Sequence, residues 1–183
     1  YPNTIFYYEL LGEVFFLQRK TKDLENIFNV VLGLKADAKE FYSKISFWLK
    51  ELGSINKAIE GFQLLIDNKH NISENSICLG LIYEERDDFD QALEVYKGSI
   101  NAGCTSSELL FRLGITLKRL NYLEEAVSAL ELIVQQGNES WSLLGEISQL
   151  FSELGDETKA QEFNKRALAQ RITTLEAGWR DGK

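Results

Sequence analysis

Apolar residues recur along the chain with the spacing of a helix face and, over longer distances, with a fixed period. The segment "DQALEVYKGSI", which begins at Asp90, has one apolar face, and the small residue Ala92 lies within that face. Alanine returns every 34 residues, at Ala58, Ala92, Ala126 and Ala160. A period of this length is typical of repeat proteins in which each repeat is one supersecondary unit. The pattern therefore predicts a series of similar helical units.

Stacking the sequence on this period gives rows that begin near Ile5, Lys39, Ser73, Ser107 and Trp141. In each row, positions 4, 7, 8 and 11 have the spacing of one helix face, and positions 20, 24, 27 and 28 have that of a second. Position 8 is always small, with the residues Gly12, Ser46, Gly80, Gly114 and Ser148. A small residue at position 8 opposite the alanine at position 20 lets two antiparallel helices approach closely.

Polar residues separate the two predicted helices of each row. Asp88 with Gln91, and Asn121 with Glu124, have the spacing of a capping box at the start of a second helix. In two other rows, the corresponding turn contains a glycine, Gly53 or Gly155, which suits the end of a first helix. Each row is thus predicted to form a helix, a tight turn and a second helix.

These rows resemble the tetratricopeptide repeat, a 34-residue helix–turn–helix unit with small residues at positions 8, 20 and 27 and large ones at 4, 7, 11 and 24. The best match, "SICLGLIYEERDDFDQALEVY", has Leu79, Gly80, Tyr83, Ala92 and Tyr96 in place. The resemblance implies an all-α fold, a right-handed α-solenoid of antiparallel helix pairs. The repeats are expected at 5–38, 39–72, 73–106, 107–140 and 141–171. Residues 172–183 are expected to form a helical extension or cap.

The rows depart from the family at a few positions. The proline that the family often carries at position 32 is absent, and so is its tryptophan at position 4. Leu24 replaces alanine in the first row, and Asn164 replaces a large residue in the last. Atypical first and last repeats are common in such arrays. In the extension, Ile172, Leu175 and Trp179 continue the apolar pattern, either as a cover for the last repeat or as a surface that docks onto another repeat.

In the family, first helices line a concave face that holds a peptide or helix of another protein. The corresponding stripe here is apolar at its centre and charged at its edges, which implies a groove for an apolar or amphipathic segment. The candidate groove residues are Phe47, Lys50, Ile77, Leu81, Glu84, Phe111, Arg112, Ile115 and Lys118. The alternative is that these apolar side chains pack against the first helix of the next repeat.

Composition narrows the classes of partner and reaction. The chain has 183 residues, a hydrophobic fraction of 44% and a formal net charge of −8, which opposes binding to nucleic acid and to anionic membranes. It has no apolar run long enough to span a bilayer. Two cysteines, Cys78 and Cys104, do not make a disulfide framework, so a reducing cytoplasmic compartment is expected. The chain begins without methionine, and we expect it to be a piece of a longer protein.

Candidate catalytic and metal sites are few. His70 is the only histidine and has no nucleophile at a recognisable spacing, while Cys78, Cys104 and His70 match no zinc pattern. We therefore expect a non-enzymatic adaptor or scaffold that binds another protein and needs no cofactor or metal. One alternative is a structural scaffold that self-associates into homo-oligomers. Another is an arm of a larger multidomain protein whose catalytic domain lies elsewhere.

The best-known pocket of the family clamps a C-terminal carboxylate with lysine at position 5, asparagine at position 9 and further basic residues. Here those two positions carry Glu9 and Glu13, Ser43 and Phe47, or Ile77 and Leu81, depending on the row. We predict that peptides with an acidic C-terminus do not bind. The glutamates would repel a carboxylate, and the other side chains carry no positive charge to attract it. Isothermal titration should show no submicromolar binding of such a peptide, and a submicromolar isotherm would contradict this prediction.

Overall fold

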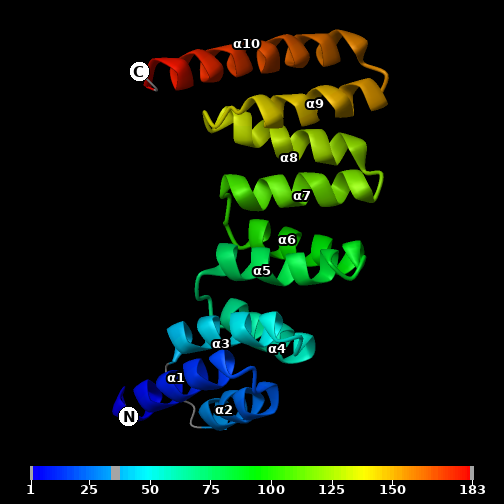
Figure 1. Cartoon of the computed structure of the whole chain (residues 1–183). Coiled ribbons are helices and arrows are strands. Elements are labelled where there is room, and N and C mark those ends of the chain that lie inside the picture. The colour runs from blue at the N-terminus through cyan, green and yellow to red at the C-terminus, as the bar shows by residue number, and fades with distance from the viewer. Residues whose placement is uncertain (1, 34–37, 182–183) are drawn as a thin grey trace. The chain divides into compact units, whose positions relative to one another are not determined.

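The computed structural model describes residues 2–33 and 38–181, and the side chains of 4–33 and 38–175. All of the regular structure in these residues is helical (Figure 1). The helices are α1 (Pro2–Leu17), α2 (Thr21–Gly33), α3 (Lys39–Glu51), α4 (Ile55–Asp67), α5 (Ile72–Glu84), α6 (Phe89–Asn101), α7 (Ser107–Arg119), α8 (Leu123–Gln135), α9 (Trp141–Glu153) and α10 (Glu157–Asp181). The prediction of an all-α fold is confirmed.

The chain divides into two compact units, Tyr1–Asp87 and Asp88–Lys183. The first unit contains α1 to α5 and the second contains α6 to α10. The boundary falls in the turn between α5 and α6, so the third expected repeat has one helix in each unit. The division of the chain into five repeats stays a prediction.

In the first unit, sequence neighbours pack side by side, α1 with α2, α3 with α4 and α4 with α5, and α3 also packs against α1 and α2 (Figure 1). Its core contains aromatic and aliphatic side chains that are almost fully buried, namely Leu24, Phe28, Phe41, Ile45, Leu49, Phe62, Leu65 and Leu79. Gly61 of α4 lies directly against Ser46 of α3, where an added methyl group would overlap the serine hydroxyl. The small residue at position 8 of this row therefore marks the closest approach of α3 and α4.

In the second unit, α7 packs with α8 and α9 with α10, and α6 and α8 each pack against the first helix that follows. Gly114 of α7 faces Leu130 and the backbone carbonyl of Ala126 on α8. Ser148 of α9 donates a 2.7 Å hydrogen bond from its hydroxyl to the carbonyl oxygen of Ala160 on α10. In both pairs, the small residue at position 8 thus lies opposite the alanine at position 20, as predicted.

The alanines at position 20 are buried. Ala58, Ala92 and Ala126 are 0% exposed and Ala160 is 6% exposed. Ala92, the small residue that interrupts the apolar face of α6, is therefore a buried residue, as the sequence predicts.

The turns that follow the first helices share one backbone conformation. Gly53 and Gly155 have φ values of +82° and +79°, so their predicted role at the end of a first helix is confirmed. Arg19, Asp87 and Asn121, at the same position of the other rows, are also left-handed, with φ between 55° and 64°. After Gly53, the amide of Ser54 donates to the carbonyl of Leu49 at 2.8 Å, which closes the helix end.

The predicted capping boxes are not present. Asp88 precedes α6 without a side-chain bond to the helix, and the residue that precedes α8 is Tyr122, not Asn121. Asn121 is instead the left-handed residue that closes α7, so its position in the tight turn prevents it from capping α8. The side chains that do cap helices are Ser106, Ser140 and Asp156, at the starts of α7, α9 and α10.

The last helix is longer than predicted for a second helix of a repeat. α10 has 25 residues, whereas each helix from α2 to α9 has 13. It runs without a break from the fifth expected repeat into the expected extension at 172–183, as far as Asp181. The side chain of Trp179 lies outside the described residues. Asn164, which replaces a large residue in this row, is exposed.

We predict that Gly114→Ala destabilises the protein by about 1–3 kcal/mol, because overpacking a close contact forces neighbouring groups to move. The new methyl carbon would lie 2.5 Å from Cδ2 of Leu130, and that leucine is itself 0% exposed. Gly145→Ala in α9 is the matched control, because nothing lies within 4 Å of its Cβ. The control should gain about 0.5–1 kcal/mol from helix propensity. Urea unfolding followed by circular dichroism measures both, and equal stability of the two variants would contradict the close approach.

Candidate functional site

The predicted groove residues belong to both units. Phe47 and Lys50 on α3, and Ile77, Leu81 and Glu84 on α5, lie in the first unit. The other four, Phe111, Arg112, Ile115 and Lys118, lie on α7 in the second unit.

The apolar members of the first set are partly accessible. Phe47 is 51% exposed, and Ile77 and Leu81 are half-buried. Accessible aromatic and aliphatic side chains on a folded surface are typical of interaction sites when they gather in a patch.

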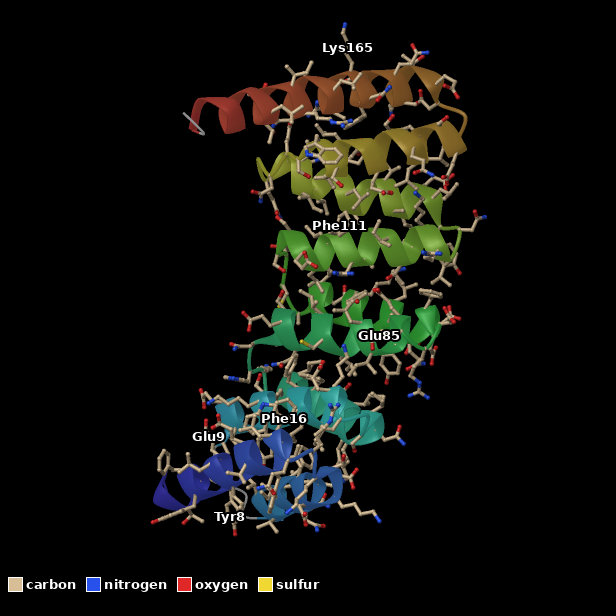
Figure 2. The ribbon with its side chains drawn as sticks, viewed as in Figure 1. Tyr8, Glu9, Phe16, Glu85, Phe111 and Lys165 are labelled. Carbon is tan, nitrogen blue, oxygen red and sulfur yellow. The ribbon has the colours of Figure 1, made fainter. Side chains whose placement is uncertain are left out.

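Ion pairs fix the first helices of this unit to one another. Lys50 Nζ lies 2.8 Å from Glu85 Oε1, which directly follows α5 (Figure 2). Lys44 on α3 pairs with Glu9 on α1, and the hydrogen bond to Glu9 raises the pKa of Lys44 above its ordinary value. Because these pairs are exposed, they contribute about 0–1 kcal/mol each and mainly fix the register of the helices.

Cys78 lies on α5 next to Ile77 and is half-buried. Burial raises the pKa of its thiol, an effect that Lys50 partly opposes and Glu74 supports. A thiol with a raised pKa is mostly protonated near neutral pH and is a poor nucleophile. Both cysteines are free, and the described residues contain no group of His, Cys, Asp or Glu that could hold a metal ion.

The second unit contains a pocket of about 420 Å³ beside Phe111. Figure 2 labels Phe111 on α7. The pocket is formed by the N-terminal half of α7, the end of α8, the loop between α8 and α9, and the first turn of α9. Its apolar walls come from Phe111, Ile133 and Leu143, and its rim from Ser107, Glu108, Asn138, Glu139, Ser140 and Ser142. A volume of this size is within the range of about 300–1,000 Å³ that is usual for binding pockets.

Hydrogen bonds hold the loop that forms the rim. Asn138 Nδ2 donates to Ser107 Oγ at 2.8 Å, and that hydroxyl donates to Gln136 Oε1 at 3.1 Å. The side chain of Gln136 also donates to the carbonyl of Thr105 at 2.9 Å. Ser140 accepts a bond from the amide of Leu143 as the cap of α9. The pocket is therefore preformed, with its loop tied to the start of α7.

The charged residues around the pocket are paired within the chain. Arg112 lies 2.9 Å from Glu108, and Arg166 lies 2.6 Å from Glu139. Lys118 Nζ, at the other end of α7, lies 3.0 Å from Glu146 Oε2. The predicted cations of this stripe are thus already neutralised by neighbouring carboxylates, which leaves the apolar surface of Phe111 and the half-buried Ile115 as its accessible centre.

The structure shows pocket residues that the sequence did not reveal. Ile133, Asn138, Ser140 and Leu143 come from a second helix, a loop and the next first helix, and no common spacing joins them to Phe111. A second apolar pocket, of about 540 Å³, lies on α1 and was also not predicted. Among the described helices, none is long and apolar enough to cross a membrane.

Comparison with solved structures identifies chains with the same arrangement of helices. A structure of MamA from Desulfovibrio magneticus RS-1 is 14% identical, covers 92% of this chain and 96% of its own, and gives a TM-score of 0.69. A second MamA structure is 17% identical, covers 96% of each chain and gives a TM-score of 0.73. The fold resembles that of MamA. The chain matches no protein-family model, and no curated protein matches its sequence.

The MamA structures confirm the predicted fold class, a tetratricopeptide-like α-solenoid of antiparallel helix pairs. At 14% and 17% identity, the similarity to MamA concerns the fold alone. The function of a fold depends on the site built on it, so the role of this chain has to be argued from its own surface residues.

We predict that Cys78 reacts slowly with iodoacetamide in the folded protein, because burial keeps its thiol protonated. In a Cys104→Ser variant, the pH at which the alkylation rate is half-maximal should lie above the ordinary thiol pKa of about 8.5. The same variant in denaturant is the control and should show the ordinary pKa. A folded midpoint at or below that of the unfolded chain would contradict the burial of this thiol.

Proposed function

We propose that this chain is a non-enzymatic protein-interaction module that binds an apolar or amphipathic segment of another protein, as an adaptor or scaffold. The observation that carries the proposal is the preformed pocket beside Phe111, with apolar walls and a rim fixed by hydrogen bonds. On α7, Phe111 and Ile115 have the spacing i and i+4, so they share one helix face. Together they offer an apolar strip with a pocket at one end.

The pocket suits one large apolar side chain of the partner. Full burial of a leucine or phenylalanine side chain contributes about 1.5–3 kcal/mol. The charges nearby are already paired, so binding at this surface depends on apolar burial more than on charge. A partner helix with apolar residues at positions i and i+4 would place one of them in the pocket and the other on Ile115.

The other groove residues extend this proposal to the first unit. Phe47, Ile77 and Leu81 are accessible apolar side chains of the same type, and Lys50 and Glu84 lie beside them on the same helices. They are proposed to contact further apolar residues of the partner.

The chemistry of the pocket supports binding rather than a reaction. Its titratable side chains are Glu108 and Glu139, and each is paired with an arginine. A carboxylate that is held by an arginine is less available to exchange a proton with a bound substrate. The net charge of −8 opposes nucleic acid as the partner. The two free cysteines support an intracellular location.

We predict that peptides selected on the wild-type protein from a displayed random library carry apolar residues at helical spacing. Their affinity should fall about 10- to 100-fold for the double variant Phe111→Ser/Ile115→Ser, because the burial of about 1.5–3 kcal/mol per side chain is lost. Fluorescence anisotropy of a labelled selected peptide measures this loss, and circular dichroism checks that helicity is retained.

Two further variants complete the test. Ser142→Trp should fill the mouth of the pocket and weaken the same peptides while Phe111 remains in place. Leu132→Glu is the matched control, because Leu132 is 45% exposed on α8 and does not line the pocket. If the selected peptides bind the pocket variants and the wild-type protein equally, the pocket is not the binding site.

A further inference from the structure

α1 exposes a broad apolar face that no described helix covers. Six large apolar side chains on it, Phe6, Tyr7, Leu10, Leu11, Val14 and Leu17, are between 42% and 73% exposed. Four of them line the 540 Å³ pocket together with Thr4 and Tyr8. The other side of the helix is packed, since Phe16 stacks on Trp48 of α3 with a 5.6 Å separation of ring centroids.

The other first helices show what this face normally contacts. The positions equivalent to Tyr7 and Leu11 are at most 8% exposed in α3, α5, α7 and α9, with the residues Phe41, Asn75, Leu109, Leu143, Ile45, Leu79, Leu113 and Ile147. Each of these helices packs against the second helix that precedes it. Among the described helices, none covers this face of α1 in the way that a preceding second helix covers the other first helices.

The face on α1 is also wider than a preceding helix requires. The residues equivalent to Phe6 in the later first helices are charged or polar, namely Glu40, Glu74, Glu108 and Ser142. The residues equivalent to Leu17, at or directly after the ends of these helices, are all charged, namely Glu51, Glu85, Arg119 and Glu153. In addition, Tyr7, Leu10, Val14 and Leu17 follow the 3–4–3 spacing of a seam that pairs with another helix.

α10 has a second exposed seam in the other unit. Leu168, Ile172 and Leu175 follow a 4–3 spacing and are between 53% and 58% exposed. The side of α10 that contacts α9 carries Ala160, Phe163 and Ala167, which are buried. α10 is 12 residues longer than α9, so its C-terminal half continues beyond the helix that it packs on.

Charge distinguishes the ways in which two copies could pair these seams. The described side chains of α1 include two acidic residues, Glu9 and Glu13, and no basic residue. The segment 165–175 of α10 carries Lys165, Arg166 and Arg171 and no acidic residue, and Lys165 extends from the side opposite α9 (Figure 2). Pairing α1 with α1, or α10 with α10, brings like charges together. Glu9 already pairs with Lys44, and Arg166 with Glu139, within the chain. The charges that distinguish the pairings are therefore Glu13 on α1 and Lys165 and Arg171 on α10. Pairing α1 with α10 brings these opposite charges together.

We propose that a second copy of this chain covers these faces, with α1 of one copy packed along Leu168, Ile172 and Leu175 of α10 of the next. This contact repeats the packing of a first helix on a preceding second helix that both units show within themselves. It joins two different surfaces, so a pair of bound copies leaves one free α1 and one free α10, and association continues beyond a dimer, as a ring or as an open chain. Two single helices bury less than the ~1,200 Å² typical of stable complexes, so assembly depends on concentration.

The test is sedimentation velocity of the 183-residue chain over a dilution series that reaches hundreds of micromolar. The wild-type protein should form species larger than a dimer as its concentration rises, and fewer of them at high salt, because salt screens the opposite charges. Leu10→Glu/Val14→Glu in α1 should remain monomeric, and so should Ile172→Glu in α10. All three positions are exposed, so the fold should be retained, and circular dichroism checks this.

Mixing the two variants tests the pairing itself. The α1 variant keeps an intact α10 and the α10 variant keeps an intact α1, so the mixture should give a 1:1 dimer and nothing larger. Leu132→Glu, an exposed substitution away from both seams, should assemble as the wild-type protein does. None of the substituted positions lines the pocket beside Phe111, so peptide binding and self-association can fail independently.

Four results would overturn the proposal. If the wild-type protein stays monomeric, the exposed faces of α1 and α10 do not bind a second copy and contact a different partner. Assembly that stops at a dimer would indicate a symmetric contact. Dimers of the α10 variant alone would indicate pairing of α1 with α1, and dimers of the α1 variant alone would indicate pairing of α10 with α10.

Discussion

The close approach of paired helices at small residues is the constraint on which the packing of both units depends. Where Gly114 faces Leu130, there is no space for a larger side chain, and at the next pair of helices the Ser148 hydroxyl reaches the backbone carbonyl of Ala160. The distance between two helices is set by the side chains at their crossing, so these positions bring the backbones together. Large residues on either side, such as Phe62 and Leu130, then fill the remaining space and are fully or almost fully buried.

This packing also produces the pocket in the second unit. α7 and α9 are successive first helices, and the loop between α8 and α9 lies against the start of α7 through Asn138, Ser107 and Gln136. The pocket beside Phe111 lies between these elements. Ion pairs such as Lys118 with Glu146 join neighbouring first helices at the other end. The apolar centre of the surface therefore remains accessible while its charged edges are used within the fold.

The first and last helices differ from the others because a repeat buries its apolar faces only against its neighbours. Inside each unit, every first helix after α1 is covered by the second helix before it. α1 keeps an apolar face nonetheless, and this face includes positions where the other first helices are charged or polar. α10 is polar at Asn164, but Leu168, Ile172 and Leu175 give it an exposed apolar seam farther along. The two ends are therefore not simple polar caps, and their exposed apolar residues are the basis of the proposed contact between copies.

The sequence by itself determined the class of the fold and the helices that form it. A small residue every 34 positions has a single physical cause, the crossing of two helices, so Ala58, Ala126 and Ala160 could be assigned to buried crossings from their spacing alone. Caps were less predictable, because Asn121 was placed in a left-handed turn by the geometry of the connection. The tertiary structure alone decided the pocket walls and the ion pairs. Ile133, Leu143 and Phe111 meet only when three elements pack together, and no local spacing encodes such a meeting.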